Sequence, residues 1–470
     1  MGDDQALTPI VHLDVATRRE RGRAARKAVA RGAHGEWSPP SDRRDPVDLI
    51  AGQEVSRLAP LLPVRHERML ASPFAFYRGA AILMASDLAT QPDTGLRVQC
   101  CGDAHLANFG GFSAPDRRTV FDMNDFDETN PGPFEWDLKR LATSFELAWR
   151  EIGLDPAEGR GVVEGTVRAY RTAMAQFAEL RNLDLWYTRL DTDEMIERWR
   201  KEAPKGAVAR MRKTVAKAQA KNSLKAFAKL TEVVDGKVRI IADPPLIVPL
   251  REYDEDPVAL KTWLEDRFRA YRHTLQPDRR RLLESYRFVD AAHKVVGVGS
   301  VGTRCFIFLM LGRDDADPLF IQVKEANESV LEPYAGGSGY ANHGQRVVEG
   351  QRLLQASSDI ILGWLRAAGI DGVERDFYVR QLWDGKLSPD YATMDVGRLR
   401  IFGEMCGWTL ARGHARSGDR VAIASYLGSG TQFDRALADF AAAYAEQNQR
   451  DYEAVSAAVR SGRLAPVPTA

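Results

Sequence analysis

Apolar residues recur three and four positions apart through much of the first half of the chain, which is the period of an amphipathic helix. This pattern occupies residues 73–89 (PFAFYRGAAILMASDLA) and dominates from 134 to about 285, starting with FEWDLKRLATSFELAWREIG. Two short runs between these helices, LRVQC at 96–100 and TVFDMNDF at 119–126, predict strands instead.

The pattern changes at residue 286, where predicted strands replace helices. YRFVDAAHKVVGVGSVGTRCFIFLML and PLFIQVKEA are β-leaning runs, GQRVVEGQRLLQAS has helical periodicity, and FYVRQLWDG at 377–385 is again a strand. Residues 396–462 return to the helical period. This order predicts an α+β protein of two lobes, a large helical lobe and a small antiparallel β-rich lobe encoded late in the sequence.

These patterns divide the chain of 470 residues into four parts. We expect a polar, Arg-rich N-terminal arm at 1–58, either solvated or wrapped around the fold, and the first part of the large helical lobe at 59–285. The small lobe would span 286–395, and the helices of 396–470 would complete the large lobe.

Composition narrows the class of protein. Lys plus Arg and Asp plus Glu both total 65, so net charge gives no reason to expect a nucleic-acid partner. The longest apolar run, CFIFLML at 305–311, is too short to span a membrane, and the acidic N-terminus lacks a hydrophobic signal core. The four cysteines form no CxxC pair and no plausible disulfide framework. A cytoplasmic protein is therefore expected.

A basic stripe runs along one predicted helix, because lysines recur at every fourth position. Its members are Lys213, Lys217, Lys221, Lys225 and Lys229. A solvated helix face explains such a stripe, since lysine is normally exposed. The alternative is a docking surface for an acidic partner.

A glycine motif lies near the start of the predicted small lobe. Gly297, Gly299 and Gly302 form GxGxxG, a common pattern that means little without its context. A dinucleotide-binding turn would lead into a helix, whereas here CFIFLML follows and predicts strand–turn–strand. In protein kinases such a glycine hairpin covers the phosphates of a nucleotide. The three glycines are therefore candidates for binding ATP.

The next predicted strand, FIQVKEA, places Lys324 among apolar neighbours, as the phosphate-binding lysine of kinases is placed. A buried ammonium group needs an anionic partner, and Glu349 on the following predicted helix is the best candidate. Glu325 and Glu328 are nearer in sequence but lie on or just after the strand. The alternative is an edge-strand lysine that extends to solvent.

Carboxylates and an amide cluster much earlier in the chain. In GDAHLAN, Asp103 and Asn108 have the spacing of the D-x-x-x-x-N catalytic loop of phosphoryl transfer. The Asp would orient and deprotonate an attacking hydroxyl, and the Asn oxygen would hold Mg²⁺, which prefers hard oxygen ligands. Asp122, Asp125 and Asp127 lie on or just after the next strand and are candidates for further ligands. Singly, an Asp or Asn beside glycine is an ordinary turn former; together with the glycine motif, Lys324 and the glutamate, they complete an ATP site.

SPFAFYRGAA, CGDAHLANFG, FDMNDFDETNPGPFEWDLKRLATS and RVVEGQRLLQ resemble a bacterial family catalogued as domain of unknown function 2252. That family is distantly similar to the protein-kinase-like superfamily, especially the aminoglycoside and choline phosphotransferases. The resemblance implies that Asp103 is the catalytic base, that Asn108 and Asp125 bind metal with Asp122 as the rival of Asp125, and that Asp137 satisfies backbone groups near the catalytic loop. His105 would contact phosphate or support the loop, and Arg78 would contact phosphate or tie helices together.

The order of these parts differs from that of a conventional kinase. Here the catalytic loop and metal-binding Asp precede the glycine loop, the lysine and the glutamate by some 190 residues. A circular permutation of a two-lobed kinase-like fold accounts for this order. FYVRQLWDG would lead into the hinge, and FGEMCGWTLARGHARSGD at 402–419 resembles the helix that precedes the catalytic loop in phosphotransferases.

The expected function is a Mg²⁺- and ATP-dependent phosphotransferase with an acceptor that the sequence does not identify. AMP transfer on the same fold and a non-catalytic nucleotide-binding module are the alternatives within this fold. A metallohydrolase built on Asp103, His105, Asp122 and Asp125 is the alternative outside it; such an enzyme would not need Lys324.

Overall fold

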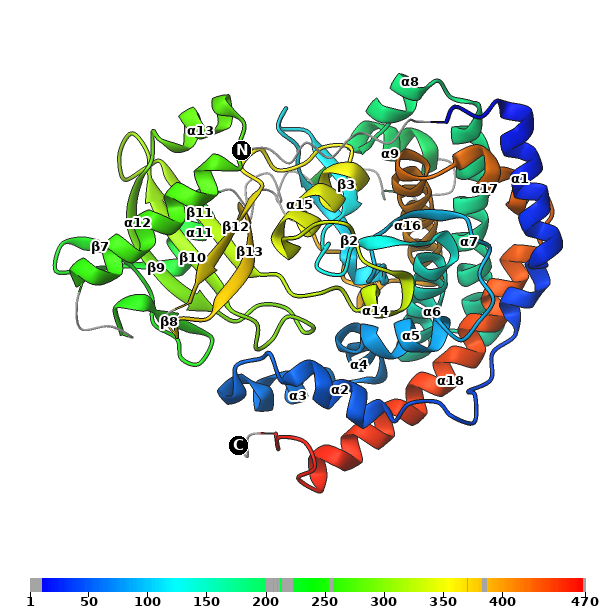
Figure 1. Ribbon diagram of the computed structural model, residues 1–470, viewed down its shortest axis with the longest axis horizontal. Coiled ribbons are helices and arrows are strands. Elements are labelled where there is room, and N and C mark those ends of the chain that lie inside the picture. Colours follow the sequence, from blue (N-terminus) through cyan, green and yellow to red (C-terminus); the bar gives the residue numbers. More distant parts are fainter. Residues whose placement is uncertain are drawn as a thin grey trace.

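The computed structural model describes residues 11–199, 206, 209, 212–213, 223–252, 257–369, 371–382 and 387–467. It has a mixed α+β fold in which a six-stranded sheet lies at one end of the molecule and a body of packed helices at the other (Figure 1). Short strands and connecting loops lie between these two parts.

The six-stranded sheet is antiparallel, with the order β12-β13-β11-β10-β9-β8. Its strands are β8 (Ile247–Pro249), β9 (Arg287–Lys294), β10 (Cys305–Leu311), β11 (Pro318–Glu325), β12 (Gly363–Ala368) and β13 (Glu374–Gln381). Helix α15 (His343–Leu354) follows β11 in the chain. The strands predicted around 286–311 and 318–325 and the helix after them are confirmed. The strand predicted at 377–385 corresponds to β13, and its residues 383–385 lie outside the described part of the chain; β12 was not predicted.

Alternation along these strands gives the sheet two different faces. Phe308, Ile321 and Val379 point to one face and pack with α12 (Pro257–His273) and α13 (Pro277–Leu283). Ile307 and Phe320 point to the other face and pack with α11 (Ser223–Leu230). Both faces are therefore covered, which explains why β10 and β11 are apolar almost throughout.

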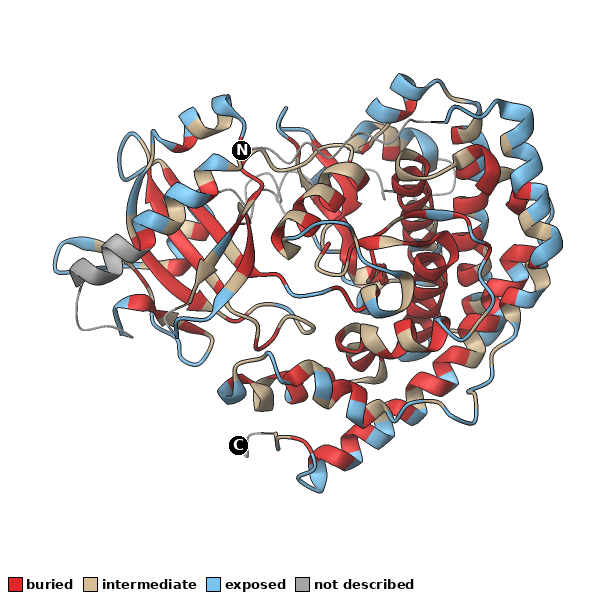
Figure 2. Cartoon of the chain, in the orientation of Figure 1, coloured by how far each residue is buried: buried red, intermediate tan, exposed pale blue. Residues whose placement is uncertain are grey.

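The helical body is built on a large hydrophobic core. Its main helices are α6 (Phe134–Ile152), α7 (Pro156–Glu179), α16 (Val396–Ser417), α17 (Arg420–Leu427) and α18 (Gln432–Arg460). Helix α6 is buried along most of its length, and Figure 2 shows the buried residues concentrated in the centre of this body. Asp155 and Asp395 cap α7 and α16 by accepting from backbone N–H groups of the first turn.

Smaller elements connect the helical body to the sheet. The helices are α3 (Leu62–Met69), α4 (Pro73–Gly79), α5 (Ala81–Leu88), α8 (Asn182–Tyr187), α9 (Thr192–Trp199) and α14 (Glu332–Ala335). The strands β1 (Arg97–Cys100) and β4 (Asn130–Pro133) form one pair, and β6 (Thr231–Val234) and β7 (Lys237–Ile240) form another. A three-stranded sheet has the order β2 (Phe109–Ser113), β3 (Thr119–Met123) and β5 (Leu190–Asp191). The strand predicted at 119–126 ends at Met123, and the single helix predicted at 73–89 is broken at Ala80.

The N-terminal arm wraps around the C-terminal helices. Helix α1 (Val15–Ala28) packs on α17, and α2 (Pro46–Glu54) packs on α18 (Figure 1). Between these helices, Arg43 forms ion pairs with Asp87 of α5 at 2.7 Å and with Asp451 of α18 at 2.7 Å. Of the two expectations for this segment, wrapped and solvated, the wrapped arm is the one observed.

The segment 223–285 does not pack as the sequence suggested. Helices α11 and α12 pack on the six-stranded sheet, and β8 is one of its strands, because their apolar residues share cores with β9–β13. The expected boundary at 285/286 therefore lies too late in the chain. Lys225 and Lys229 of the basic stripe are exposed on α11, while Lys217 and Lys221 lie outside the described residues. Within the described residues, no helix is both long and apolar enough to cross a membrane.

Candidate active site

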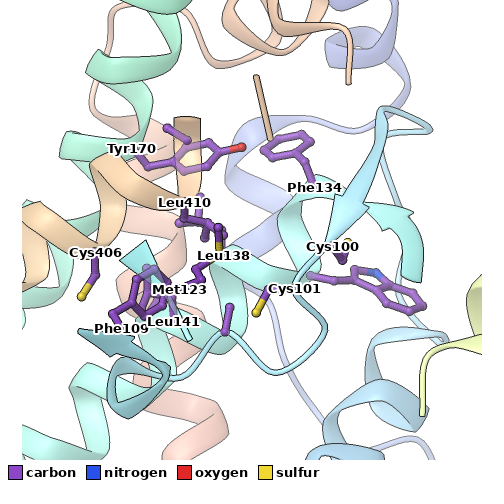
Figure 3. Packing of buried hydrophobic residues seen from close by; sticks show 14 of the residues in the cluster. Cys100, Cys101, Phe109, Met123, Phe134, Leu138, Leu141, Tyr170, Cys406 and Leu410 are labelled. Atoms are coloured by element: carbon purple, nitrogen blue, oxygen red, sulfur yellow. The ribbon is translucent and has the colours of Figure 1, made fainter. Parts of the chain in front are cut away.

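The loop that joins β1 to β2 carries Asp103, His105 and Asn108 and is fixed at its start by α6. The backbone N–H groups of Cys101 and Gly102 donate to Asp137 of α6 at 2.6 and 2.9 Å, which confirms the role expected for this Asp. Gly102 has φ +86°, and a Cβ there would lie 2.0 Å from the carbonyl oxygen of Glu128. Cys101 points into the helical core (Figure 3).

Asp103 and Asn108 are held on the same loop by short contacts. The Nε of Arg140 on α6 donates to Asp103 Oδ1 at 2.6 Å, and Arg140 also donates to the carbonyl of Tyr77 at 2.7 Å. The Asn108 amide donates to the Asp103 carbonyl at 2.6 Å. Because a carbonyl can only accept, this bond fixes the orientation of the amide and leaves the Asn108 side-chain oxygen as the group a metal ion would use.

His105 supports the loop from inside. It is 3% exposed, its Nε2 lies 3.6 Å from Asp103 Oδ2, and its Nδ1 is buried without a hydrogen-bond partner in the described part of the chain. Burial, together with the charges of Arg78 and Arg140, lowers the pKa of His105 well below its usual value. The imidazole is therefore neutral at pH 7.

Lys324 of β11 is buried, as its apolar neighbours indicated, and its partner is Asp127. The ammonium group forms an ion pair with Asp127 and donates to the Ser300 hydroxyl at 2.6 Å. The Tyr378 hydroxyl of β13 donates to the other Asp127 oxygen at 2.8 Å. Burial opposes both charges, but the pair outweighs it, so the pKa of Lys324 is raised and that of Asp127 lowered.

The expectation that Glu349 partners Lys324 is wrong in this structure. Glu349 of α15 is partly exposed and pairs with Arg352 one turn later on the same helix, at 3.0 Å. The side chain that α15 sends towards the site is the fully buried Arg346, which donates to the carbonyls of Asp127 at 2.9 Å and Thr129 at 2.6 Å. Glu325 pairs with Arg304 at 3.4 Å rather than with Lys324.

The glycine motif forms the turn between β9 and β10, as predicted. Gly297 and Gly302 have φ of +68° and +90°, conformations that favour glycine. Three arginines of the N-terminal region hold the loop by its carbonyl groups: Arg68 donates to Gly297 at 2.8 Å, Arg65 to Gly299 at 2.9 Å and Arg57 to Val301 at 2.6 Å. The loop is therefore anchored to α3 and to the segment before it.

These segments meet around one cavity of about 250 Å³. Its walls include Asp103, His105, Asn108, Asp125 and Asp127 from the first half of the chain and Gly297, Gly299 and Ser300 from the glycine loop. Lys324 lies behind Asp127 and Ser300 and is 2% exposed. The cavity thus joins segments almost 200 residues apart in the sequence.

Asp122 does not belong to this cavity. It is 2% exposed, forms an ion pair with Arg412 of α16, and accepts from the backbone N–H of Met123 at 2.9 Å. This ion pair ties β3 to the helical body. Asp122 is therefore a structural residue in this fold, and the metallohydrolase set that included it is not assembled.

Residues 57–458 match a family model described as an uncharacterized protein conserved in bacteria (DUF2252). The chain belongs to this family. The matched segment includes the loop of Asp103, the glycine loop, Lys324 and α15, and therefore nearly the whole candidate site. Comparisons with curated proteins and with solved structures found no match.

Several carboxylates line the cavity of this DUF2252 protein. Burial raises the pKa of Asp103, although Arg140 opposes this effect, and burial together with the neighbouring Asp127 raises the pKa of Asp125. Burial raises the pKa of Glu128 to about 7, although its carboxylate accepts from the Val330 N–H at 2.7 Å. Several carboxylates close together disfavour one another's charge, and an added cation relieves that repulsion.

The oxygen-bearing side chains of the cavity suit Mg²⁺ if water and substrate phosphates complete its coordination shell. Within the described residues, no three His, Cys, Asp or Glu side chains are grouped so that they would hold a metal by themselves. Mg²⁺ usually takes only one or two carboxylates and completes its shell with water and substrate phosphates. Asp125 and the Asn108 oxygen line the same cavity and fit that requirement.

Sequence reasoning did not assign four of the residues that shape the site. They are Asp127 as the lysine partner, Arg140, Ser300 and Arg346. Asp127 lies in the repeated pattern DFD, and Ser300 lies inside the glycine motif, so both carried a local signal. Arg140 and Arg346 lie in helices whose periodicity makes them resemble ordinary polar positions, and only the tertiary packing turns them inward.

Proposed function

We propose that this protein is a Mg²⁺- and ATP-dependent phosphotransferase with a kinase-like, circularly permuted arrangement of its parts. One observation carries the proposal: a D-x-x-x-x-N loop and a glycine hairpin with its strand lysine, distant in the sequence, line or support the same cavity. Each part alone is common, but their convergence on one cavity is what phosphoryl transfer requires.

The arrangement of the sheet also supports the proposal. Counting from β9, the glycine loop joins the first and second strands, Lys324 lies on the third, and helix α15 follows. This is the order of the corresponding parts in protein kinases. The loop of Asp103 comes before rather than after these strands, which is the reason for proposing a permutation.

Each residue would have a separate task in the transfer. Asp103, oriented by Arg140, would accept the proton of the acceptor hydroxyl. Lys324 would bind phosphate oxygens, and the glycine loop would cover them with backbone N–H groups. Asn108 and Asp125 would hold Mg²⁺, which supplies positive charge against the phosphates. Catalysis would rest on positioning and charge stabilisation.

Nucleotide binding would require the site to open. Lys324 does not line the cavity, so a phosphate group that entered the cavity as it stands would not reach the ammonium group. Lys324 is also covered by Asp127 and Ser300. ATP would therefore displace Asp127 from Lys324 and lift the glycine loop from its present position.

Parallel incubations with ATP labelled at the γ- or at the α-phosphate test the proposal. A phosphotransferase transfers the γ-label to an acceptor or to water and never the α-label, whereas AMP transfer gives the opposite result. Lys324→Met should abolish the transfer. If neither label moves with a broad set of small-molecule and protein acceptors while ATP binds, the non-catalytic alternative replaces the phosphotransferase.

A further inference from the structure

A second cavity lies on the face of the six-stranded sheet that points away from Lys324. It has a volume of about 350 Å³ and is lined by Phe306 and Phe308 of β10, Val323 of β11, and Phe377 and Val379 of β13. Adjacent residues of a strand point to opposite faces, so Val323 lines this cavity while Lys324 serves the candidate active site. Helix α12 lies across this face of the sheet (Figure 1).

The walls of this cavity suit an apolar and partly aromatic molecule. Helix α12 adds Leu264, Phe268 and Tyr271 to the apolar side chains of the strands. Pockets lined mainly by apolar and aromatic side chains, with a few polar groups, are typical binding sites of small molecules.

A buried histidine interrupts the apolar lining. His293 of β9 lines the cavity, is 6% exposed, and has an Nε2 with no hydrogen-bond partner among the described residues. Its ring forms a hydrogen bond with the Thr303 backbone, and burial lowers its pKa. A neutral imidazole that donates from Nδ1 to a carbonyl leaves Nε2 as an acceptor. A buried hydrogen-bond acceptor without a donor costs free energy, so the site would favour ligands that carry a hydrogen-bond donor at this point.

The charged side chains at the cavity already have protein partners. Arg304 lies 3.4 Å from a Glu325 oxygen and 3.5 Å from an Asp371 oxygen, and Arg267 donates to the Ala368 carbonyl at 2.8 Å. The charge of Arg304 is therefore balanced by two carboxylates. This balance favours a neutral ligand over an anion.

We propose that this cavity binds a small, neutral, largely apolar molecule whose single hydroxyl group donates to Nε2 of His293. The five aromatic rings of the lining favour a ligand that itself contains a ring. The site does not depend on the proposed phosphotransferase activity, because its residues and those of the ATP site lie on opposite faces of the sheet.

Three small probes of similar shape test the class of ligand by calorimetry on the full chain. 4-Pentylphenol carries the donor, 4-pentylanisole replaces the hydroxyl hydrogen by a methyl group, and 4-pentylbenzoate carries a negative charge. One hydrogen bond to a buried acceptor predicts that the phenol binds about three- to tenfold more tightly than the anisole. The benzoate should bind more weakly than the phenol. Tighter binding of the benzoate would overturn the neutral class and identify an anion site at Arg267 and Arg304.

Two variants test the place of binding. His293→Phe keeps an aromatic ring beside Phe306 and removes the acceptor, so the phenol should lose its three- to tenfold advantage while the anisole is unaffected. Ala367→Trp fills the cavity from β12 and should abolish binding of both probes. Val373→Trp, at an exposed position of the same β12–β13 hairpin, is the matched control and should bind normally.

An unstable variant does not prevent the test, because the affinities of the phenol and the anisole are compared within each protein. Unfolding midpoints of the unliganded variants identify any that fail to fold. Equal affinity for the phenol and the anisole in the wild type, or binding that survives Ala367→Trp in a folded protein, would overturn the proposal.

Discussion

Removing Asp127 leaves a buried ammonium group without its ion-pair partner, so Asp127→Ala should destabilise the protein strongly. Lys324 is 2% exposed, whereas the Asp127 side chain is 26% exposed and faces the cavity. Breaking a buried pair by removing one partner costs about 3–5 kcal/mol, because an uncompensated charge remains. Ser300 still accepts from the ammonium group, so the lower end of this range is expected.

The structure predicts an asymmetry between the two partners. In Lys324→Met the remaining Asp127 reaches the cavity, accepts from Tyr378 and is solvated, so the loss should be about 1 kcal/mol. The double variant Asp127→Ala/Lys324→Met should recover most of the loss of Asp127→Ala, because no charge is left buried.

Thermal unfolding of the four proteins measures this cycle. An unfolding entropy of about 2 cal/mol/K per residue gives about 1 kcal/mol/K for 470 residues, so Asp127→Ala should lower the midpoint by roughly 3 °C. Glu349→Gln is the control: its pair with Arg352 is partly exposed, and its loss should cost less than about 0.5 kcal/mol. The reasoning is refuted if Lys324→Met is the more destabilising single change, or if Glu349→Gln destabilises as much as Asp127→Ala.

Three further predictions concern the loop of Asp103 and the carboxylates that line the cavity. Because folding raises the pKa of Glu128 from 4.5 to about 7, the folded state holds more protons between these values, and wild-type stability should fall as pH rises through this window. The fall is at most roughly 3.4 kcal/mol, and Glu128→Gln should remove this contribution in urea unfolding measured from pH 5 to 8. Asp137→Ala leaves two buried backbone N–H groups without their acceptor and should lower the unfolding free energy by about 2–4 kcal/mol. A loss below about 1 kcal/mol would show that these two hydrogen bonds are dispensable. Gly102→Ala should prevent stable folding, because its Cβ would meet the Glu128 carbonyl, whereas Gly95→Ala, also at positive φ but with nothing within 4 Å, should cost only about 1 kcal/mol in the same assay.

Local patterns were sufficient to predict the elements that carry the site. The strand–turn–strand around Gly297–Gly302, the strand of Lys324 and the helix of Glu349 follow from residue type and periodicity, which act over a few positions. The burial of Lys324 also followed from its apolar neighbours. The hydrogen bonds from the loop backbone to Asp137 were expected only from the family resemblance.

The partners of these residues could not be predicted in the same way. Whether Asp127 or Glu349 pairs with Lys324 depends on how the loop after β3 packs against β11 and β13. This contact joins segments almost 200 residues apart in the sequence. Asp122 and Asp125 look equivalent in the sequence, but the strand ends at Met123, so Asp122 faces Arg412 in the helical body while Asp125 reaches the cavity. Helix α12 has an ordinary amphipathic pattern, which does not reveal that its partner is the sheet.

Binding of ATP with Mg²⁺ is the most direct test of the central claim that the two distant segments form one nucleotide site. Thermal unfolding in Mg²⁺ with ATP should show wild type stabilised by about 3 kcal/mol at a ligand concentration a hundred times Kd, roughly 3 °C for this chain. Asp125→Ala from the first segment and Lys324→Met from the second should each lose this stabilisation. A wild-type protein with an unchanged midpoint would contradict the account, as would ATP stabilisation that either variant retains in full.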